Sequence, residues 1–124
     1  MEMTAFQRRA AVALLSMAAA TAMSTALAPA ASADGYVGAI AYSRGGGMYG
    51  RAWDAPTKAA AVSAAMSACG YTDCQVLVTF TNCGAIAYDA AGDRQGGYGP
   101  TLGAAEQDAL NRLGGGWIDT WACN

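Results

Sequence analysis

The four cysteines of this 124-residue chain are the residues whose types and spacing most clearly permit chemistry. Cys69 and Cys74 are close in sequence, whereas Cys83 and Cys123 stand alone. A zinc site would need further cysteine or histidine pairs, and the sequence contains no histidine. A thioredoxin-like redox centre would need a Cys-x-x-Cys motif, which is absent. The cysteines therefore favour two disulfide bonds over a metal site, and four cysteines allow three pairings.

Other candidate catalytic groups lack the partners that their chemistry requires. Ser43, Ser63 and Ser67 have no histidine to activate them, and no Gly-x-Ser-x-Gly motif is present. Asp89 and Asp93 could in principle act as paired carboxylates on a glycoside. Their sequence, Asp-Ala-Ala-Gly-Asp, is more typical of a turn that uses aspartate and glycine for local hydrogen bonds. We therefore expect no enzyme activity, no catalytic residue, no metal and no cofactor.

Aromatic residues between glycines are the remaining signal for binding. Most of the tyrosines and tryptophans are expected to fill a core that is short of branched aliphatic residues. Tyr49, Trp53 and Tyr98 fall on strands that we expect at sheet edges. They form our candidate binding surface, because exposed rings can make a platform for glycans or peptides.

The N-terminal segment has the features of an export signal. Arg8 and Arg9 precede a long uncharged, alanine-rich stretch, and a small-x-small cleavage site follows at 31–33. The sequence predicts a signal peptide over 1–33 and a single secreted domain over 34–124. A retained membrane anchor is the alternative, but alanine-rich sequence partitions weakly into lipid. We expect a protein that is secreted or held in the cell envelope, without stable membrane insertion after cleavage, where disulfides persist.

An internal repeat organises the domain. The pentapeptide Gly-Ala-Ile-Ala-Tyr occurs at 38–42 and again, identically, at 84–88. It defines two repeats, at about 36–82 and 83–123. Two copies are too few for a solenoid, so a pseudo-symmetric single domain is the better interpretation.

The repeat also favours one pairing of the cysteines. The second half lacks counterparts of both Cys69 and Cys74, as expected if these two residues bond to each other. Cys83 and Cys123 then remain as partners at equivalent ends of the two repeats.

Each repeat reads as strand, turn, strand, helix and strand. In the first, Thr57 is a suitable N-cap for the helix and Gly70 a suitable residue to end it. The expected strands are 36–43, 48–53, 75–81, 84–89, 95–99 and 116–122, and the expected helices are 57–69 and 101–113. The pattern predicts an α+β fold of two pseudo-symmetric ββαβ halves, with an antiparallel or mixed sheet, two helices packed on one face and disulfide staples.

Composition and charge narrow the function classes. The formal net charge is −2, and no basic stripe is present that could neutralise phosphates, so we expect no nucleic-acid partner. The 16 glycines and few branched aliphatic residues imply a small core. A domain of this kind needs covalent staples.

In the order of its motifs the chain resembles the domain-of-unknown-function family 4189, a family of secreted bacterial proteins. The resemblance covers about 36–123 and rests on the two Gly-Ala-Ile-Ala-Tyr segments, the alanine-rich helix ending at Cys69-Gly70 and the strand that begins Cys74-Gln75. Members commonly carry a cysteine pair between helix and strand in both halves, whereas this chain has Leu113 and a Gly-Gly-Gly run in the second half. The resemblance implies secretion and a two-layer fold, and it implies no activity.

These observations together predict a secreted, non-catalytic domain that binds a partner in the cell envelope or outside the cell. The partner would be an extracellular or cell-wall ligand or protein. The alternative is a secreted enzyme inhibitor or immunity-type protein.

Overall fold

The computed structural model describes residues 35–124, so the predicted signal peptide at 1–33 lies outside the described residues. The elements follow the order expected for two ββαβ halves. They are β1 (Val37–Ser43), β2 (Met48–Ala55), α2 (Lys58–Cys69), β3 (Gln75–Phe80), β4 (Cys83–Tyr88), β5 (Arg94–Gly99), α3 (Leu102–Leu113) and β6 (Trp117–Cys123).

Each half forms its own three-stranded antiparallel sheet with its first strand in the centre. The strand order is β2-β1-β3 in one sheet and β5-β4-β6 in the other. The identical pentapeptides therefore occupy the two central strands. The predicted α+β class and antiparallel pairing are confirmed.

The two helices begin and end in the same way. The hydroxyl oxygens of Thr57 and Thr101 accept hydrogen bonds from the backbone N–H groups of Ala60 and Ala104. Gly70, with φ 78°, closes α2 in the left-handed conformation that favours glycine. Both helices face their sheets through alanines, which lets helix and sheet approach closely.

The pentapeptide works as a unit that separates two packing faces. Its alanines, such as Ala39 and Ala85, are fully buried under the helix of their own half. The isoleucines between them, Ile40 and Ile86, point the other way and pack together with Phe80 in a core between the two sheets. Alternate residues of a strand point to opposite faces, so one five-residue segment contributes to both cores.

Glycine at the start of each pentapeptide makes room for a single ring. A Cβ atom at either Gly38 or Gly84 would overlap the side chain of Phe80. The phenyl ring thus packs against the central strands of both sheets, at the point where the two repeats meet.

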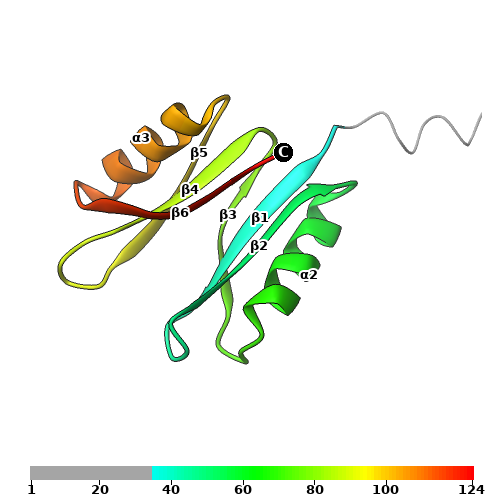
Figure 1. The fold of residues 1–124 in the computed structure, drawn as a ribbon, viewed down its shortest axis with the longest axis horizontal. Coiled ribbons are helices and arrows are strands. Elements are labelled where there is room, and N and C mark those ends of the chain that lie inside the picture. Colours follow the sequence, from blue (N-terminus) through cyan, green and yellow to red (C-terminus); the bar gives the residue numbers. More distant parts are fainter. Residues whose placement is uncertain (1–34) are drawn as a thin grey trace, which may run out of the picture. The chain divides into compact units, whose positions relative to one another are not determined.

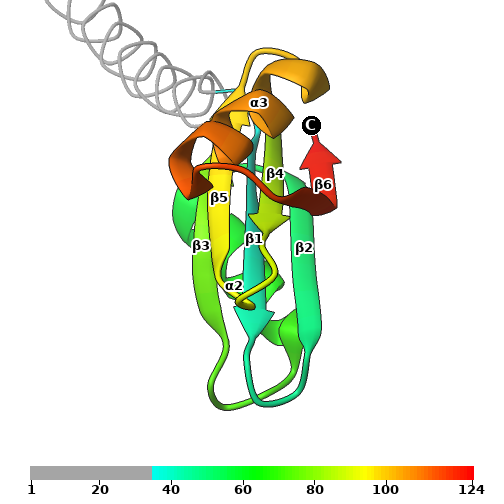
Figure 2. The ribbon, with the colours of Figure 1, turned by 90° about the vertical axis from the view of Figure 1, so that its left-hand side faces the viewer.

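The helices lie on opposite outer faces, which corrects the expectation that both cover one face of a single sheet. Figure 1 shows α2 outside the sheet of β1, β2 and β3, and α3 outside the sheet of β4, β5 and β6. Figure 2, seen from the side of α3, shows the axes of β1, β2, β3 and β5 roughly aligned, while β1 pairs antiparallel with β2 and β3. Because each half forms a separate sheet with a helix on one face only, the other face of each sheet, which carries an isoleucine, is left uncovered by its helix. These two faces pack against each other.

The two disulfides join the pairs that the repeat favours. Cys69–Cys74 ties the end of α2 to the start of β3. Cys83–Cys123 links directly opposite residues of the paired strands β4 and β6. Within residues 35–124, no helix is long and apolar enough to cross a membrane.

Candidate functional site

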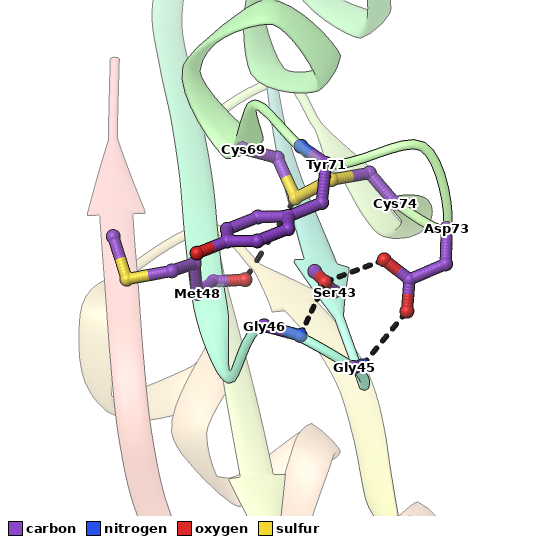
Figure 3. The surroundings of a disulfide bond; sticks show 8 residues. All are labelled: Ser43, Gly45, Gly46, Met48, Cys69, Tyr71, Asp73 and Cys74. Carbon is purple, nitrogen blue, oxygen red and sulfur yellow. Dashed lines mark hydrogen bonds between the residues drawn. A yellow bond between two sulfur atoms is a disulfide. The ribbon is translucent and has the colours of Figure 1, made fainter.

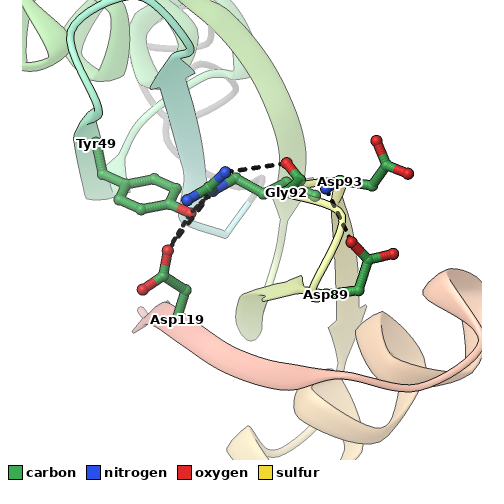
Figure 4. Close-up of polar contacts among 6 residues, drawn as sticks. Tyr49, Asp89, Gly92, Asp93 and Asp119 are labelled. Atoms are coloured by element: carbon green, nitrogen blue, oxygen red, sulfur yellow. Dashed lines mark hydrogen bonds and ion pairs between the residues drawn. The ribbon is translucent and has the colours of Figure 1, made fainter.

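A polar cluster joins the two sheets at one end of the core between them. The Tyr49 hydroxyl on β2 donates to Oδ2 of Asp119 on β6 at 2.6 Å, and it accepts from Nε of Arg94 on β5 at 2.7 Å. Figure 4 shows the ring of Tyr49 reaching across to Asp119. Burial, followed by the hydrogen bond to Asp119, raises the pKa of Tyr49, so the phenol stays protonated and holds both partners.

Arg94 is the centre of this cluster. Its guanidinium stacks over the ring of Tyr42 at 4.2 Å and lies 5.9 Å from the ring centre of Tyr88. Tyr42 and Tyr88 are the last residues of the two pentapeptides, so both repeats present a ring to the same cation. Nη1 of Arg94 also donates to the backbone carbonyl of Gly92 at 3.2 Å.

The three residues of our candidate binding surface do not come together. Tyr49 is half-buried in the cluster just described. Trp53 is 53% exposed on β2, which lies beside β6 at one edge of the paired sheets. Tyr98 is exposed on β5, beside β3 at the opposite edge.

Trp53 instead shares a surface with residues that the sequence analysis did not select. Arg51, Trp53 and Trp121 line a shallow cavity of about 200 Å³, together with Ala122 and Cys123. Nη1 of Arg51 donates to the backbone carbonyl of Trp121 at 2.9 Å and so ties β2 to β6. We call Arg51, Trp53 and Trp121 the tryptophan surface.

Sequence reasoning missed Trp121 because 68 positions separate it from Trp53. One signal was available: β6 carries Trp117 and Trp121 in a strand that was expected to close the domain. Both tryptophans are exposed, which is unusual for rings expected to fill a core.

A larger, more polar cavity of about 490 Å³ opens at the β1–β2 hairpin end of the molecule. Its lining includes the side chains of Arg44, Gln75 and Arg94, and the ring of Tyr42. It shares no lining residue with the tryptophan surface.

Asp89, one of the two possible catalytic carboxylates, serves the turn between β4 and β5. Its Oδ1 accepts hydrogen bonds from the backbone N–H groups of Ala91 and Asp93, both at 3.0 Å. Figure 4 shows the side chains of Asp89 and Asp93 in this turn. No group of three or more potential metal ligands occurs among residues 35–124.

Ser43 is held in a structural clasp beside the first disulfide. It is fully buried, its hydroxyl donates to Oδ1 of Asp73 at 2.6 Å, and the Gly46 N–H donates to the same hydroxyl. Oδ2 of Asp73 accepts from the Gly45 N–H at 2.7 Å (Figure 3). The carboxylate thus fastens the β1–β2 hairpin to the loop closed by Cys69–Cys74.

The contribution of this clasp to stability should depend on pH. The hydrogen bond from Ser43, followed by that from Gly45, lowers the pKa of Asp73 from its ordinary value of 3.8. A lowered pKa in the folded state adds stability above the ordinary value, and this stability is lost as the pH falls through the lowered one. The melting temperature of Asp73→Asn should therefore lie below that of the parent near neutral pH. The gap should close toward about pH 2, in thermal melts across this range.

Asp93→Asn is the matched control, because the Asp93 carboxylate accepts no hydrogen bond from the part of the chain that the structure describes. Its melting temperature should follow that of the parent at every pH. A gap for Asp73→Asn that is the same at both ends of the range would contradict the clasp.

The fold and its sites define a class: a small α+β domain of two disulfide-closed ββαβ halves, packed sheet to sheet. The chain belongs to the family described as Domain of unknown function (DUF4189), which matches residues 37–123. Protein Rv1269c of Mycobacterium tuberculosis is 64% identical over 89 residues, covering 70% of this chain and 68% of the relative.

A second relative has a solved structure. Uncharacterized protein Rv1813c of Mycobacterium tuberculosis is 49% identical over 89 residues, covering 72% of this chain and 61% of the relative. The NMR structure of Rv1813c matches this fold with a TM-score of 0.61, covering 72% of this chain and 75% of that one. The match supports the fold, and the names of these relatives state no activity.

Proposed function

We propose that the protein is an exported, non-catalytic binding module whose tryptophan surface binds a cell-wall glycan. The observation that carries the proposal is the pairing of two exposed tryptophans from different sheets at one cavity beside an arginine. Large rings on a soluble domain are costly to leave in water unless they serve contact with a partner. Sugars fit such a site because their C–H faces pack on indole rings, while their hydroxyls bond to a guanidinium.

The surface is held rigid before any ligand binds. The hydrogen bond from Arg51 to Trp121 fixes β2 against β6, and Cys83–Cys123 anchors the end of β6 to β4. A preformed site loses little conformational entropy on binding.

Two features support an exported protein without catalysis. Both cysteine pairs are closed, which suits an oxidising compartment. Ser43 and Asp89, two of the groups that could have served catalysis, are engaged in holding turns.

Replacing both Trp53 and Trp121 by alanine should weaken binding to purified cell-wall polymer by at least about tenfold. Tryptophans that become buried when a partner binds contribute much of the binding free energy. Co-sedimentation of the oxidised protein with insoluble peptidoglycan measures this. Trp117→Ala is the matched control, because Trp117 is at least as exposed but lies against Tyr88, outside the cavity.

Two outcomes would contradict the proposal. Polymer binding that survives loss of both tryptophans would remove the surface from the function. Inhibition of a lysozyme or a protease, with no polymer binding, would instead favour the alternative of a secreted inhibitor.

A further inference from the structure

The polar cavity at the hairpin end gathers two arginines. Arg44 comes from the turn between β1 and β2, and Arg94 from the start of β5 in the other half. The cavity volume of about 490 Å³ lies within the range of small-molecule sites. The charged residues that line the cavity are these two arginines and Asp73, so its lining carries a net positive charge in a chain whose net charge is negative.

Arg94 is fixed in place by its surroundings. Nε bonds to the Tyr49 hydroxyl, Nη1 bonds to the Gly92 carbonyl, and the ring of Tyr42 supports the guanidinium plane. Within residues 35–124, Nη2 has no hydrogen-bond acceptor. Its N–H groups remain for a ligand, on a side chain that needs no reordering.

Arg44 is available in a different way. Its guanidinium makes no hydrogen bond or ion pair within the described part of the chain. Asp73, the acidic residue that lines the same cavity, already uses both carboxylate oxygens to accept from Ser43 and Gly45. Oδ2 of Asp119 lies 3.6 Å from Nε of Arg94, and the same oxygen accepts the hydrogen bond from the Tyr49 hydroxyl.

The cavity therefore has more cationic donors than its own acceptors satisfy. We propose that it binds a small organic anion, of about monosaccharide size, through a carboxylate or phosphate group held between Arg44 and Arg94. Arginine suits this task because its planar fork of N–H groups matches the oxygen atoms of both anions. Gln75 and Tyr42 also line the cavity and offer contacts to the rest of the ligand.

Paired probes test the proposal and separate its two sources of charge. N-acetylmuramic acid carries a carboxylate that N-acetylglucosamine lacks, and glucose 1-phosphate carries a phosphate that glucose lacks. We expect at least one anionic probe to bind with a dissociation constant of about 1 mM or tighter and its neutral partner not to bind. The readout is a two-dimensional ¹H–¹⁵N NMR titration of the full oxidised chain, in which the Arg94 Nε–H signal should shift.

Arg44→Gln should weaken binding of that probe about tenfold, because it removes one charged partner of the anion. The variant should fold normally, since the Arg44 side chain makes no hydrogen bond in residues 35–124. Arg112→Gln removes the same charge from α3, where Arg112 pairs with Asp108, and should leave binding unchanged.

The proposal is overturned if neither anion shifts the Arg94 signal, if neutral and charged probes bind alike, or if both arginine variants lose binding equally. These outcomes are independent of the tryptophan surface, because the cavity shares no residue with it. Loss of polymer binding through Trp53 and Trp121 would leave the proposed anion site unaffected, and absence of anion binding would leave the proposed glycan binding unaffected.

Discussion

Replacing both Cys83 and Cys123 by alanine should lower the melting temperature by about 15 °C or more. This disulfide spans a sequence separation of 40, and loop-closure entropy in the unfolded chain assigns such a bond about 4 kcal/mol. For a domain of this size each kcal/mol corresponds to roughly 4–8 °C. The bond also anchors the end of β6, which carries Trp121 and Asp119, so its loss should loosen the contacts between the sheets. Calorimetry or thermal melts followed by circular dichroism measure the effect.

The double alanine variant of Cys69 and Cys74 is the internal comparison. Its bond spans a sequence separation of only 5, for which the same entropy argument gives about 2 kcal/mol. We expect a clearly smaller fall in melting temperature. A fall as large as that of the first variant would show that the short bond acts through packing at α2. Peptide mapping without reduction should recover Cys69–Cys74 and Cys83–Cys123 in the parent protein.

Local sequence signals were sufficient for the elements and their ends. The repeated pentapeptide marked one strand in each half, and threonine before an alanine-rich run marked the start of α2 at Thr57. These signals work because strand alternation and helix capping depend on residues only a few positions apart. The observed strands and helices begin and end within about two residues of the predicted ranges, in line with the usual uncertainty of helix ends.

Contacts between the halves could not be predicted in the same way. The partner of Tyr49, Asp119, lies 70 positions away, and so does Trp121 from Arg51. Tyr49 and Trp53 lie on the same side of β2. Local sequence pattern alone could not distinguish the half-buried ring of Tyr49 from the exposed ring of Trp53. The difference arises when β6 of the second half is laid beside β2 of the first.

The expectation of a single helix-covered face failed for a related reason. Small residues such as Ala39 and Ala85 fit a sheet face that a helix approaches closely. They did not show whether the strands of the two halves would join edge to edge. The face-to-face arrangement buries Ile40, Ile86 and Phe80 together in one apolar core.

The closest approach of helix and sheet predicts the second large effect. A Cβ atom at Gly50 on β2 would overlap the backbone oxygen of Ala65 and the backbone nitrogen of Cys69, and would lie 2.9 Å from the Cα of Cys69. These are backbone atoms of α2, so no side-chain rotation relieves the overlap, and the helix must move off the sheet. We expect Gly50→Ala to lower the free energy of unfolding by about 3 kcal/mol, and Gly50→Val by more. Urea denaturation measures both.

Gly103→Ala separates this steric effect from the general consequences of replacing a glycine. Gly103 is exposed in α3, and nothing lies within 4 Å of the position of its Cβ. Alanine there should stabilise the protein by about 0.5–1 kcal/mol, because it lowers the entropy of the unfolded chain and favours the helix. Gly50 is not among the residues with positive φ, so any loss at that position reports crowding and not backbone strain. A Gly50→Ala variant as stable as the parent would mean that α2 lies farther from its sheet than the structure places it.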